Sequence, residues 1–321
     1  MPRPVMIGIV GDSGSGKTTI TRGLVRVLGD EQVSHFCADD YHRFDRRQRA
    51  ERDLTPLHPD CNFLDILGQD LGHLRANEPV LKPVYQHTDG TFGAPDYFEP
   101  GRFVVTEGLL ALYTPALREM FDVRVYLDPP EELRRRWKVA RDCSRRGYTT
   151  DQVLAELDRR EPDSEEFIRP QRHHADVVVS FRPGASDEQN LLDAHLILRD
   201  TLPFPDLSAI AAEHEQGGVE LTERPGEKEL CVPGTIGAAR AAEIEEAIWG
   251  RMHFASHLRQ QRLGEFTVGT DLHRSEALAL TQLLILYHVV TARAVVALGG
   301  ESARPGVEAR TTPRLEQVTP A

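Results

Sequence analysis

The sequence has few cysteines, no long apolar run and a deficit of positive charge. Its 321 residues include four cysteines, and no two of them form a CxxC pair, so neither a zinc site nor a disulfide framework is indicated. No apolar run reaches the about 20 residues that a membrane span needs, and residues 1–5 lack the apolar stretch of a secretory signal. We therefore expect a cytoplasmic protein with no membrane partner.

The charge balance limits the partners further. The formal net charge is −12, which argues against generic nucleic-acid binding. Hydrophobic residues make up 40% of the chain and charged residues 27%, a mixture typical of globular proteins. An acidic protein of this kind can bind a phosphorylated ligand only if it concentrates its positive charge locally.

Apolar runs alternate with helical periodicity over the first 200 residues. Strands are predicted at 5–10, 33–37, 102–106, 123–127 and 176–180, and helices at 17–28, 63–75, 130–146 and 150–160; residues 46–52 are predicted to be a loop or short surface helix. This alternation predicts an α/β fold, with a parallel sheet covered by helices on both faces.

The composition changes after about residue 183. A strand is possible at 195–199, residues 209–233 are mixed with turn-forming glycine and proline, and helices are predicted at 238–262 and 275–298. The last helix is apolar but contains Gln282, His288 and Arg293, which indicates a core or oligomer-interface helix rather than a membrane span. We expect a domain at 1–200, a mainly helical α/β extension at 201–300 and a disordered tail at 301–321.

Residues 11–18 (GDSGSGKT) match the P-loop pattern GxxxxGK[ST] and lie between a predicted strand and a predicted helix. Glycines let successive backbone N–H groups point at phosphate oxygens, and the helix N-terminus adds its positive dipole end. The lysine reaches the β- and γ-phosphates, and the hydroxyl that follows it binds Mg²⁺. The pattern predicts a P-loop NTPase-type fold that binds ATP and Mg²⁺ through Gly11, Asp12, Ser13, Gly14, Ser15, Gly16, Lys17, Thr18 and Thr19.

Acidic residues follow two of the predicted strands. Asp39 and Asp40 come directly after the second strand, and Glu107 ends the third. Since the carboxyl ends of parallel strands line the ligand crevice, the aspartates could bind magnesium or accept the proton of an attacking hydroxyl. Glu107 is expected on the magnesium side, together with Thr18.

The positive charge is concentrated in one segment. Seven of the thirteen residues from 134 to 146 are Arg or Lys, and at helical spacing Arg134, Lys138, Arg141 and Arg145 share one face. A charged run of this kind is either a solvated surface or a lid that covers phosphates and supplies charge to the transition state. The position after the fourth strand favours the lid, in which Asp142 could pair with an arginine or contact a substrate hydroxyl.

These motifs, in this order, resemble those of the phosphoribulokinase family. The resemblance rests on residues 39–46 (DDYHRFDR), 82–87 (KPVYQH), 107–109 (EGL), the run from Trp137 to Tyr148, and Pro170-Gln171 followed by residues 175–178 (ADVV). It extends over residues 4–182, and its spacing is similar to that of the photosynthetic, non-proteobacterial branch.

The resemblance implies an ATP-dependent, magnesium-dependent kinase that converts ribulose 5-phosphate to ribulose 1,5-bisphosphate, and hence a place in the Calvin cycle. It implies that Asp39 is the general base for the C1 hydroxyl, that Lys138 contacts the nucleotide phosphates and that Asp142 orients the sugar. Sugar phosphate or the transferring phosphoryl group would be held by Arg46, Arg141 and Arg146, with His42, Tyr85 and His87 in the sugar site.

The spacing of Asp39 and Arg46 is compatible with such an acceptor. A pentose phosphate carries a dianion at one end and a primary hydroxyl at the other, so its site needs basic groups and a carboxylate. Seven residues separate Asp39 from Arg46, and at about 3.3 Å per extended residue a short loop can span the molecule. A nucleoside acceptor would not need this arginine.

The sequence departs from the family pattern at two places. Leu110 stands where the family often has histidine, and Ser15 stands where the plant and cyanobacterial enzymes have a redox-regulated cysteine, although Cys37 matches the position of its disulfide partner. We therefore predict no thioredoxin-type switch through this pair. Two alternatives stay open, a uridine/cytidine kinase and a catalytically silent nucleotide-binding regulatory protein, and a homodimer or higher homo-oligomer is expected.

Overall fold

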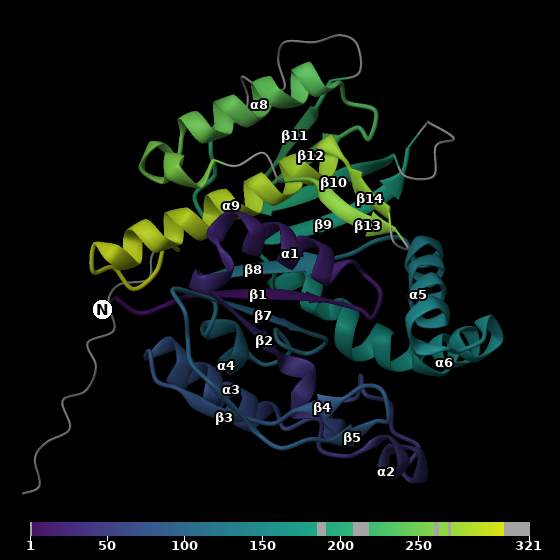
Figure 1. The fold of residues 1–321 in the computed structure, drawn as a ribbon. Coiled ribbons are helices and arrows are strands. Elements are labelled where there is room, and N and C mark those ends of the chain that lie inside the picture. The colour runs from purple at the N-terminus through teal and green to yellow at the C-terminus, as the bar shows by residue number, and fades with distance from the viewer. Residues whose placement is uncertain (1, 185–190, 208–217, 260–262, 269–270, 305–321) are drawn as a thin grey trace, which may run out of the picture.

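The computed structural model describes residues 2–184, 191–207, 218–259, 263–268 and 271–304 (Figure 1). Most of the tail predicted at 301–321 and the end of the helix predicted at 238–262 therefore lie outside the described residues.

An eight-stranded mixed sheet forms the centre of the fold. The strands β2, β7, β1, β8 and β9 run parallel, and β10, β12 and β11 extend the sheet in antiparallel fashion. In spatial order the strands are β11 (Glu220–Arg224), β12 (Glu227–Val232), β10 (Leu192–Arg199), β9 (Val177–Pro183), β8 (Val123–Leu127), β1 (Val5–Gly11), β7 (Phe103–Gly108) and β2 (Val33–Cys37). The predicted parallel sheet is confirmed in its central strands, and β11 and β12 join it from beyond residue 200.

Helices cover both faces of the sheet (Figure 1). The helices α1 (Lys17–Leu28), α8 (Ala238–Gly250) and α9 (Glu276–Ala297) bury their apolar side chains against one face. The helices α3 (Leu64–Arg75) and α4 (Pro115–Glu119) cover the other face. The predicted α/β class, with a helical C-terminal region, is confirmed.

Several elements surround the carboxyl ends of the parallel strands. The helices α5 (Glu131–Arg146) and α6 (Thr150–Asp163) project there (Figure 1), and the π-helix Ser164–Ile168 and the 3₁₀ turn Arg169–His174 lead from α6 back to β9. In the lower part of the same view lie α2 (Arg46–Glu51) and the ribbons β3 (Val80–Lys82) with β6 (Asp96–Phe98) and β4 (Tyr85–Gln86) with β5 (Thr91–Phe92). Further 3₁₀ turns are Asp30–Gln32, Ala38–Tyr41, Pro59–Cys61 and His253–Leu258, and β13 (Glu265–Val268) pairs with β14 (Asp271–Arg274).

The C-terminal helices differ from the prediction in one respect. The helix predicted at 238–262 ends at Gly250, where glycine lowers helix stability, and a 3₁₀ turn follows. The apolar helix α9 is long and apolar enough to cross a membrane by length and composition, but 72% of its most apolar 18-residue window is buried inside the structure. This burial is that of a core helix, one of the two alternatives left by the sequence.

Candidate active site

The P loop connects β1 to α1 in the backbone conformation that its glycines allow. Gly14 and Gly16 have φ values of +86° and +96°, in the left-handed region. A Cβ atom at Gly11 would lie 2.6 Å from the carbonyl oxygen of Leu127. Gly16 caps α1 without a side chain, so the N–H groups of the first turn are available to an anion such as phosphate.

Lys17 is folded over this loop. Its Nζ donates to the carbonyl oxygens of Gly11, at 2.7 Å, and Asp12, at 3.1 Å. Burial lowers the pKa of Lys17, and the negative charges of Asp39, Glu107 and Asp12 oppose that shift. The ammonium group therefore lies within electrostatic range of the acids predicted for the site. Its hydrogen-bond partners are neutral carbonyls, which phosphate oxygens can replace.

Thr18 and Glu107, the two predicted magnesium ligands, are in contact. The Thr18 hydroxyl donates to Glu107 Oε2 at 3.2 Å. Glu107 Oε1 is a buried oxygen that lies 3.2 Å from His35 Nε2 and has no hydrogen bond among the described residues that meets the geometric criteria. Burial raises the pKa of Glu107, but His35, Thr21 and Lys17 together outweigh burial and hold the pKa below its usual value. An unsatisfied carboxylate oxygen beside a hydroxyl fits Mg²⁺, which prefers oxygen ligands.

The adjacent aspartates have different surroundings. Asp40 is buried, forms an ion pair with Lys82 Nζ and accepts a hydrogen bond from the backbone N–H of Tyr85 at 3.0 Å. Asp39 is half-buried and, within the described part of the chain, accepts one hydrogen bond, from the Leu109 N–H at 2.9 Å. Because β2 pairs with β7, Asp39 lies beside the carboxyl end of the strand that carries Glu107. Of the two, Asp39 is the carboxylate left for a substrate.

Three predicted sugar-site side chains lie together. The Tyr85 ring meets the His42 ring edge-on at 4.7 Å and the His87 ring at 5.1 Å. His42 Nδ1 lies 2.7 Å from Asn62 Oδ1, and since the Asn62 amide nitrogen donates to two carbonyls, Nδ1 is the nitrogen that carries the proton. Burial lowers the pKa of His42 to about 4, so at neutral pH its Nε2 is an acceptor.

Two arginines of α2 contact this aromatic cluster. Arg46 Nη2 donates to the His87 carbonyl at 2.7 Å. Arg49, which the sequence analysis did not select, is buried and donates to the Tyr85 hydroxyl at 2.5 Å. Arg46 and Arg49 are three residues apart on one helix and therefore share a face. This spacing from Arg46 is the sequence signal that could have identified Arg49 as a site residue.

The predicted lid cations gather around one carboxylate. Asp142 is buried and pairs with Lys138, with Arg141 Nε at 2.8 Å and with Arg146 Nη1 at 3.7 Å. Burial lowers the pKa of Lys138 to about 8, although Asp142 opposes this shift. Burial also lowers the pKa of His87, and the charges of Arg146 and Arg141 add to this while Asp39 opposes it. The lid cations, His87 and Asp39 are therefore within electrostatic range of one another.

Arg134 joins the lid helix α5 to the P loop, a role that the sequence analysis did not assign. It is 4% exposed, donates to the Ser13 carbonyl at 3.0 Å and lies 3.4 Å from the Asp12 carboxylate. Asp12 also accepts a hydrogen bond from Ser164 at the start of the π-helix. Burial of Arg134 and Lys138 excludes a fully solvated surface for this face of α5, while the Arg145 side chain lies outside the described residues.

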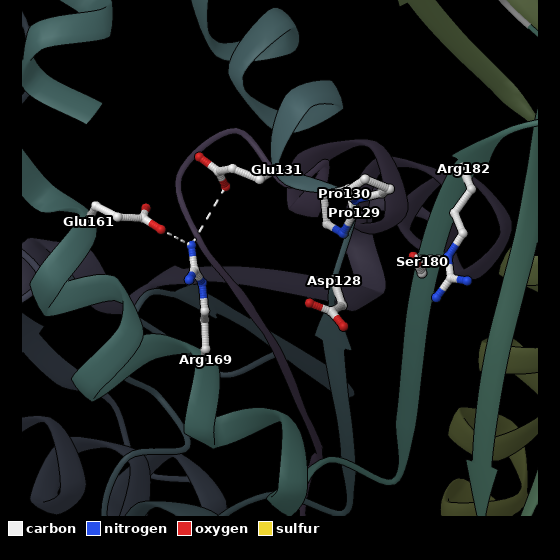
Figure 2. Close-up of a pocket in the computed structure, with 8 residues that line it drawn as sticks. All are labelled: Asp128, Pro129, Pro130, Glu131, Glu161, Arg169, Ser180 and Arg182. Atoms are coloured by element: carbon white, nitrogen blue, oxygen red, sulfur yellow. Dashed lines mark hydrogen bonds and ion pairs between the residues drawn. The ribbon is translucent and has the colours of Figure 1, made fainter. Parts of the chain in front are cut away.

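A cavity of about 570 Å³ borders the same region (Figure 2). Arg169 lies between Glu161 and Glu131, with which it forms ion pairs, and Arg134 pairs with both acids. The walls of the cavity come from the segment after β8, the first residue of α5, α6, the 3₁₀ turn before β9, and β9 itself: Asp128, Pro129, Pro130, Glu131, Glu161, Arg169, Ser180 and Arg182. Arg134 therefore links two acids of the cavity, Glu131 and Glu161, to the P loop. The carboxylates of the cavity can accept hydrogen bonds from a ligand.

The two departures from the family pattern occupy apolar or buried positions. Leu110 is 4% exposed and packs with Leu57, Leu109 and Ile168. Ser15 is 1% exposed, and its hydroxyl has no hydrogen bond among the described residues. A histidine at 110 would therefore enter an apolar cluster in this chain.

The chain is similar to known kinases over much of its length. A family model described as the phosphoribulokinase / uridine kinase family matches residues 6–186. Phosphoribulokinase from Synechocystis sp. is 38% identical over 239 residues, which are 73% of this chain and 71% of that protein. Chloroplastic phosphoribulokinase from Triticum aestivum is 30% identical over 63% of this chain, and the match spans only about half of that protein, 55%.

The other branch of the family and a solved structure are also similar. A uridine kinase from Staphylococcus epidermidis is 33% identical over 56% of this chain and 88% of its own length. The solved phosphoribulokinase from Rhodobacter spheroides superposes with a TM-score of 0.57 at 19% identity, covering 80% of this chain and 99% of that one. At this identity the likeness shows the fold alone.

Proposed function

The chain belongs to the phosphoribulokinase / uridine kinase family, and we propose that it transfers the terminal phosphoryl group of ATP to the C1 hydroxyl of ribulose 5-phosphate. One observation carries the choice of acceptor. The α2 arginines Arg46 and Arg49 lie against the Tyr85–His87 segment, on the acceptor side of Asp39. A phosphorylated sugar needs such cations, whereas the hydroxyl groups of a nucleoside do not.

The residues divide the reaction between them. Asp39 is the general base, and because its Oδ1 is held by the Leu109 N–H, Oδ2 takes the C1 proton. The P-loop N–H groups and Lys17 hold the β- and γ-phosphates. Lys138, Arg141 and Arg146 balance the charge of the transferring group once some of these cations exchange their ion pairs with Asp142 for phosphate contacts. Mg²⁺, held by Thr18 and Glu107, would neutralise charge on the phosphates.

The cavity of Figure 2 would hold the base of ATP. It lies on the far side of Arg134 from the P loop, and its carboxylates can accept hydrogen bonds from an exocyclic amino group.

A cytoplasmic location, a homo-oligomeric state, a place in the Calvin cycle and the division into parts at 1–200, 201–300 and 301–321 belong to the same proposal.

Measurement of ADP release tests this function. With ATP and magnesium, we expect turnover on ribulose 5-phosphate and none on ribose 5-phosphate, uridine or cytidine. In Asp39→Asn, kcat should fall by about 10²–10⁴-fold, the range for loss of a general base. The control Asp30→Asn changes an exposed aspartate next to α1 and should leave the rate unchanged.

Each other outcome would refute a part of the proposal. Turnover on uridine or cytidine would overturn the acceptor and leave the phosphate site intact. ATP binding without turnover on any acceptor would identify a silent regulatory protein.

A further inference from the structure

Gln282 is a completely buried amide in the apolar helix α9. It is 0% exposed. Its Oε1 accepts a hydrogen bond from the Gly264 N–H at 2.8 Å, and its Nε2 donates to the Thr19 carbonyl at 3.2 Å. Thr19 lies in the first turn of α1, two residues after Lys17. One side chain therefore joins three segments, one of which carries the phosphate-binding turn.

The surface of α1 is shaped to receive this amide. A Cβ atom at Gly23 would lie 2.2 Å from the Gln282 side chain, so only glycine leaves room for it. One further turn along, Arg26 forms an ion pair with Glu265 at 3.0 Å. Thr19, Gly23 and Arg26 follow the spacing i, i+4, i+7 and form one face of α1.

An adjoining face of α1 is fixed by the sheet. Ile20, Leu24 and Val27 are buried in the same core cluster as β1 and β8, and α9 packs on the same face of the sheet beside α1 (Figure 1). The helix is therefore held on two adjoining faces, by apolar packing on one and by Glu265 and Gln282 on the other. A buried polar side chain in such a position specifies one arrangement, because any shift leaves its partners unsatisfied.

We propose that Gln282 is a positioning residue for nucleotide binding. By fixing the carbonyl of Thr19, it holds the first turn of α1 where the N–H groups, Lys17 and Thr18 meet the phosphates. Small displacements of such groups weaken binding strongly, because the phosphates are recognised by several donors at once. This inference rests on the proposed function, and it assigns the C-terminal region a part in the ATP site.

The test compares two neighbouring buried polar residues of α9. Gln282→Met keeps the length of the side chain and removes both hydrogen bonds. Thr281→Val is the control, because Thr281 is also 0% exposed and its hydroxyl donates to Ala277 within the same helix. We expect Gln282→Met to raise the Kd and KM for ATP about three- to tenfold, with the KM for ribulose 5-phosphate unchanged, and Thr281→Val to leave both constants unchanged.

A second pair of variants changes Gly23, the residue of α1 that faces the Gln282 side chain. In Gly23→Ala the new methyl group displaces the Gln282 amide, so ATP affinity should fall as in Gln282→Met. In the double variant Gly23→Ala/Gln282→Ala the methyl group of residue 23 occupies the space that the Gln282 amide has vacated. The loss of ATP affinity should then be smaller than the sum of the losses in Gly23→Ala and Gln282→Ala.

Calorimetric titration with Mg-ATP, together with thermal unfolding, separates the outcomes. Variants with a lower Tm and wild-type ATP affinity would show that Gln282 has a structural role only and would overturn the proposal. Wild-type protein that does not bind ATP would overturn both this role and the proposed function. Wild-type protein that binds ATP but phosphorylates no sugar would contradict the proposed function alone.

Discussion

Neighbouring residues of the same type have different tasks in this site because their partners differ. Asp39 and Asp40 are adjacent in the sequence, but Asp40 is neutralised by Lys82 and fixes the backbone at Tyr85, whereas Asp39 accepts a single backbone hydrogen bond. The ion pair of Asp40 therefore supports the backbone at Tyr85, and Asp39 is the aspartate left for the proposed role of general base.

The Asp40–Lys82 pair yields a prediction about stability. In Lys82→Met the Asp40 carboxylate would stay buried without its cation, and we expect the free energy of unfolding to fall by about 3–5 kcal/mol. Urea denaturation of the variant and wild type measures this difference. Leu81→Met, at a 69% exposed position of the same strand, should change stability by less than about 0.5 kcal/mol. An unchanged unfolding midpoint in Lys82→Met would mean that the pair is not needed to stabilise Asp40.

The sequence predicted which residue types meet in the site but not how they pair. The P loop, Asp39, Glu107 and the basic run were visible as motifs at strand ends. Lys82 is 42 residues from Asp40 in the sequence, and Arg134 contacts residues more than 100 positions away. Such contacts depend on how separate elements are placed in space, which no local pattern records.

At the scale of elements, prediction succeeded where the chain carries local boundary signals. The helix α1 has the predicted limits, and glycines with positive φ flank it at 16 and 29. The hairpin β11–β12 was predicted only as turns, because its first strand is polar and mostly exposed. Its two-residue turn contains Gly226 at φ +82°, and the turn signal alone does not reveal that the hairpin joins the sheet.

The short helix α2 provides an element-scale prediction. It has only six residues, and Asp45 caps it by accepting from the Gln48 N–H at 2.7 Å while Gln48 accepts from the Asp45 N–H. Asp45→Ala removes a cap worth about 1 kcal/mol, which should loosen the helix that carries Arg46 and Arg49. We expect the KM for ribulose 5-phosphate to rise roughly fivefold, with the KM for ATP unchanged, in steady-state kinetics.

A surface variant on the same helix separates this effect from a change of charge. Arg47 is 85% exposed and pairs only with Glu51 among the described residues, so Arg47→Ala should keep both KM values. Equal rises of the two KM values in Asp45→Ala would argue against a local role for α2 in sugar binding.

At the scale of the whole molecule, the two ends of the parallel strands serve different purposes. The carboxyl ends carry the P loop, Asp39 and Glu107. At the amino end, the buried Asp122 pairs with Arg3, and the buried Asp176 pairs with Arg124 and Arg304. These arginines hold the pKa of Asp176 at about 2 against the effect of burial. Ion pairs thus join the first and last described segments to the amino ends of the strands, at the end of the sheet away from the candidate site.

His288 makes the stability of this core depend on pH. It is 2% exposed on α9, and neither ring nitrogen has a hydrogen bond in the described part of the chain. Burial lowers its pKa to about 4, although the Asp176 charge opposes the shift. An unfolded histidine has a pKa of about 6.5, so between pH 6.5 and 4 the unfolded chain binds a proton that the folded chain does not. The free energy of unfolding must therefore fall as the pH falls through this window.

Urea denaturation at pH 7.5 and pH 4.5 measures this loss. His288 should account for roughly 2.5 kcal/mol of it, and His288→Leu, which keeps an apolar side chain of similar size, should remove that part. A loss of the same sign should remain in the variant, because burial also lowers the pKa of His42 to about 4. The control Thr281→Val changes a fully buried residue of the same helix that does not titrate and should leave the difference between the two pH values unchanged. If His288→Leu lost as much stability as wild type on acidification, the buried ring would already accept a proton in the folded state, and the acid sensitivity of the core would have to lie in other groups.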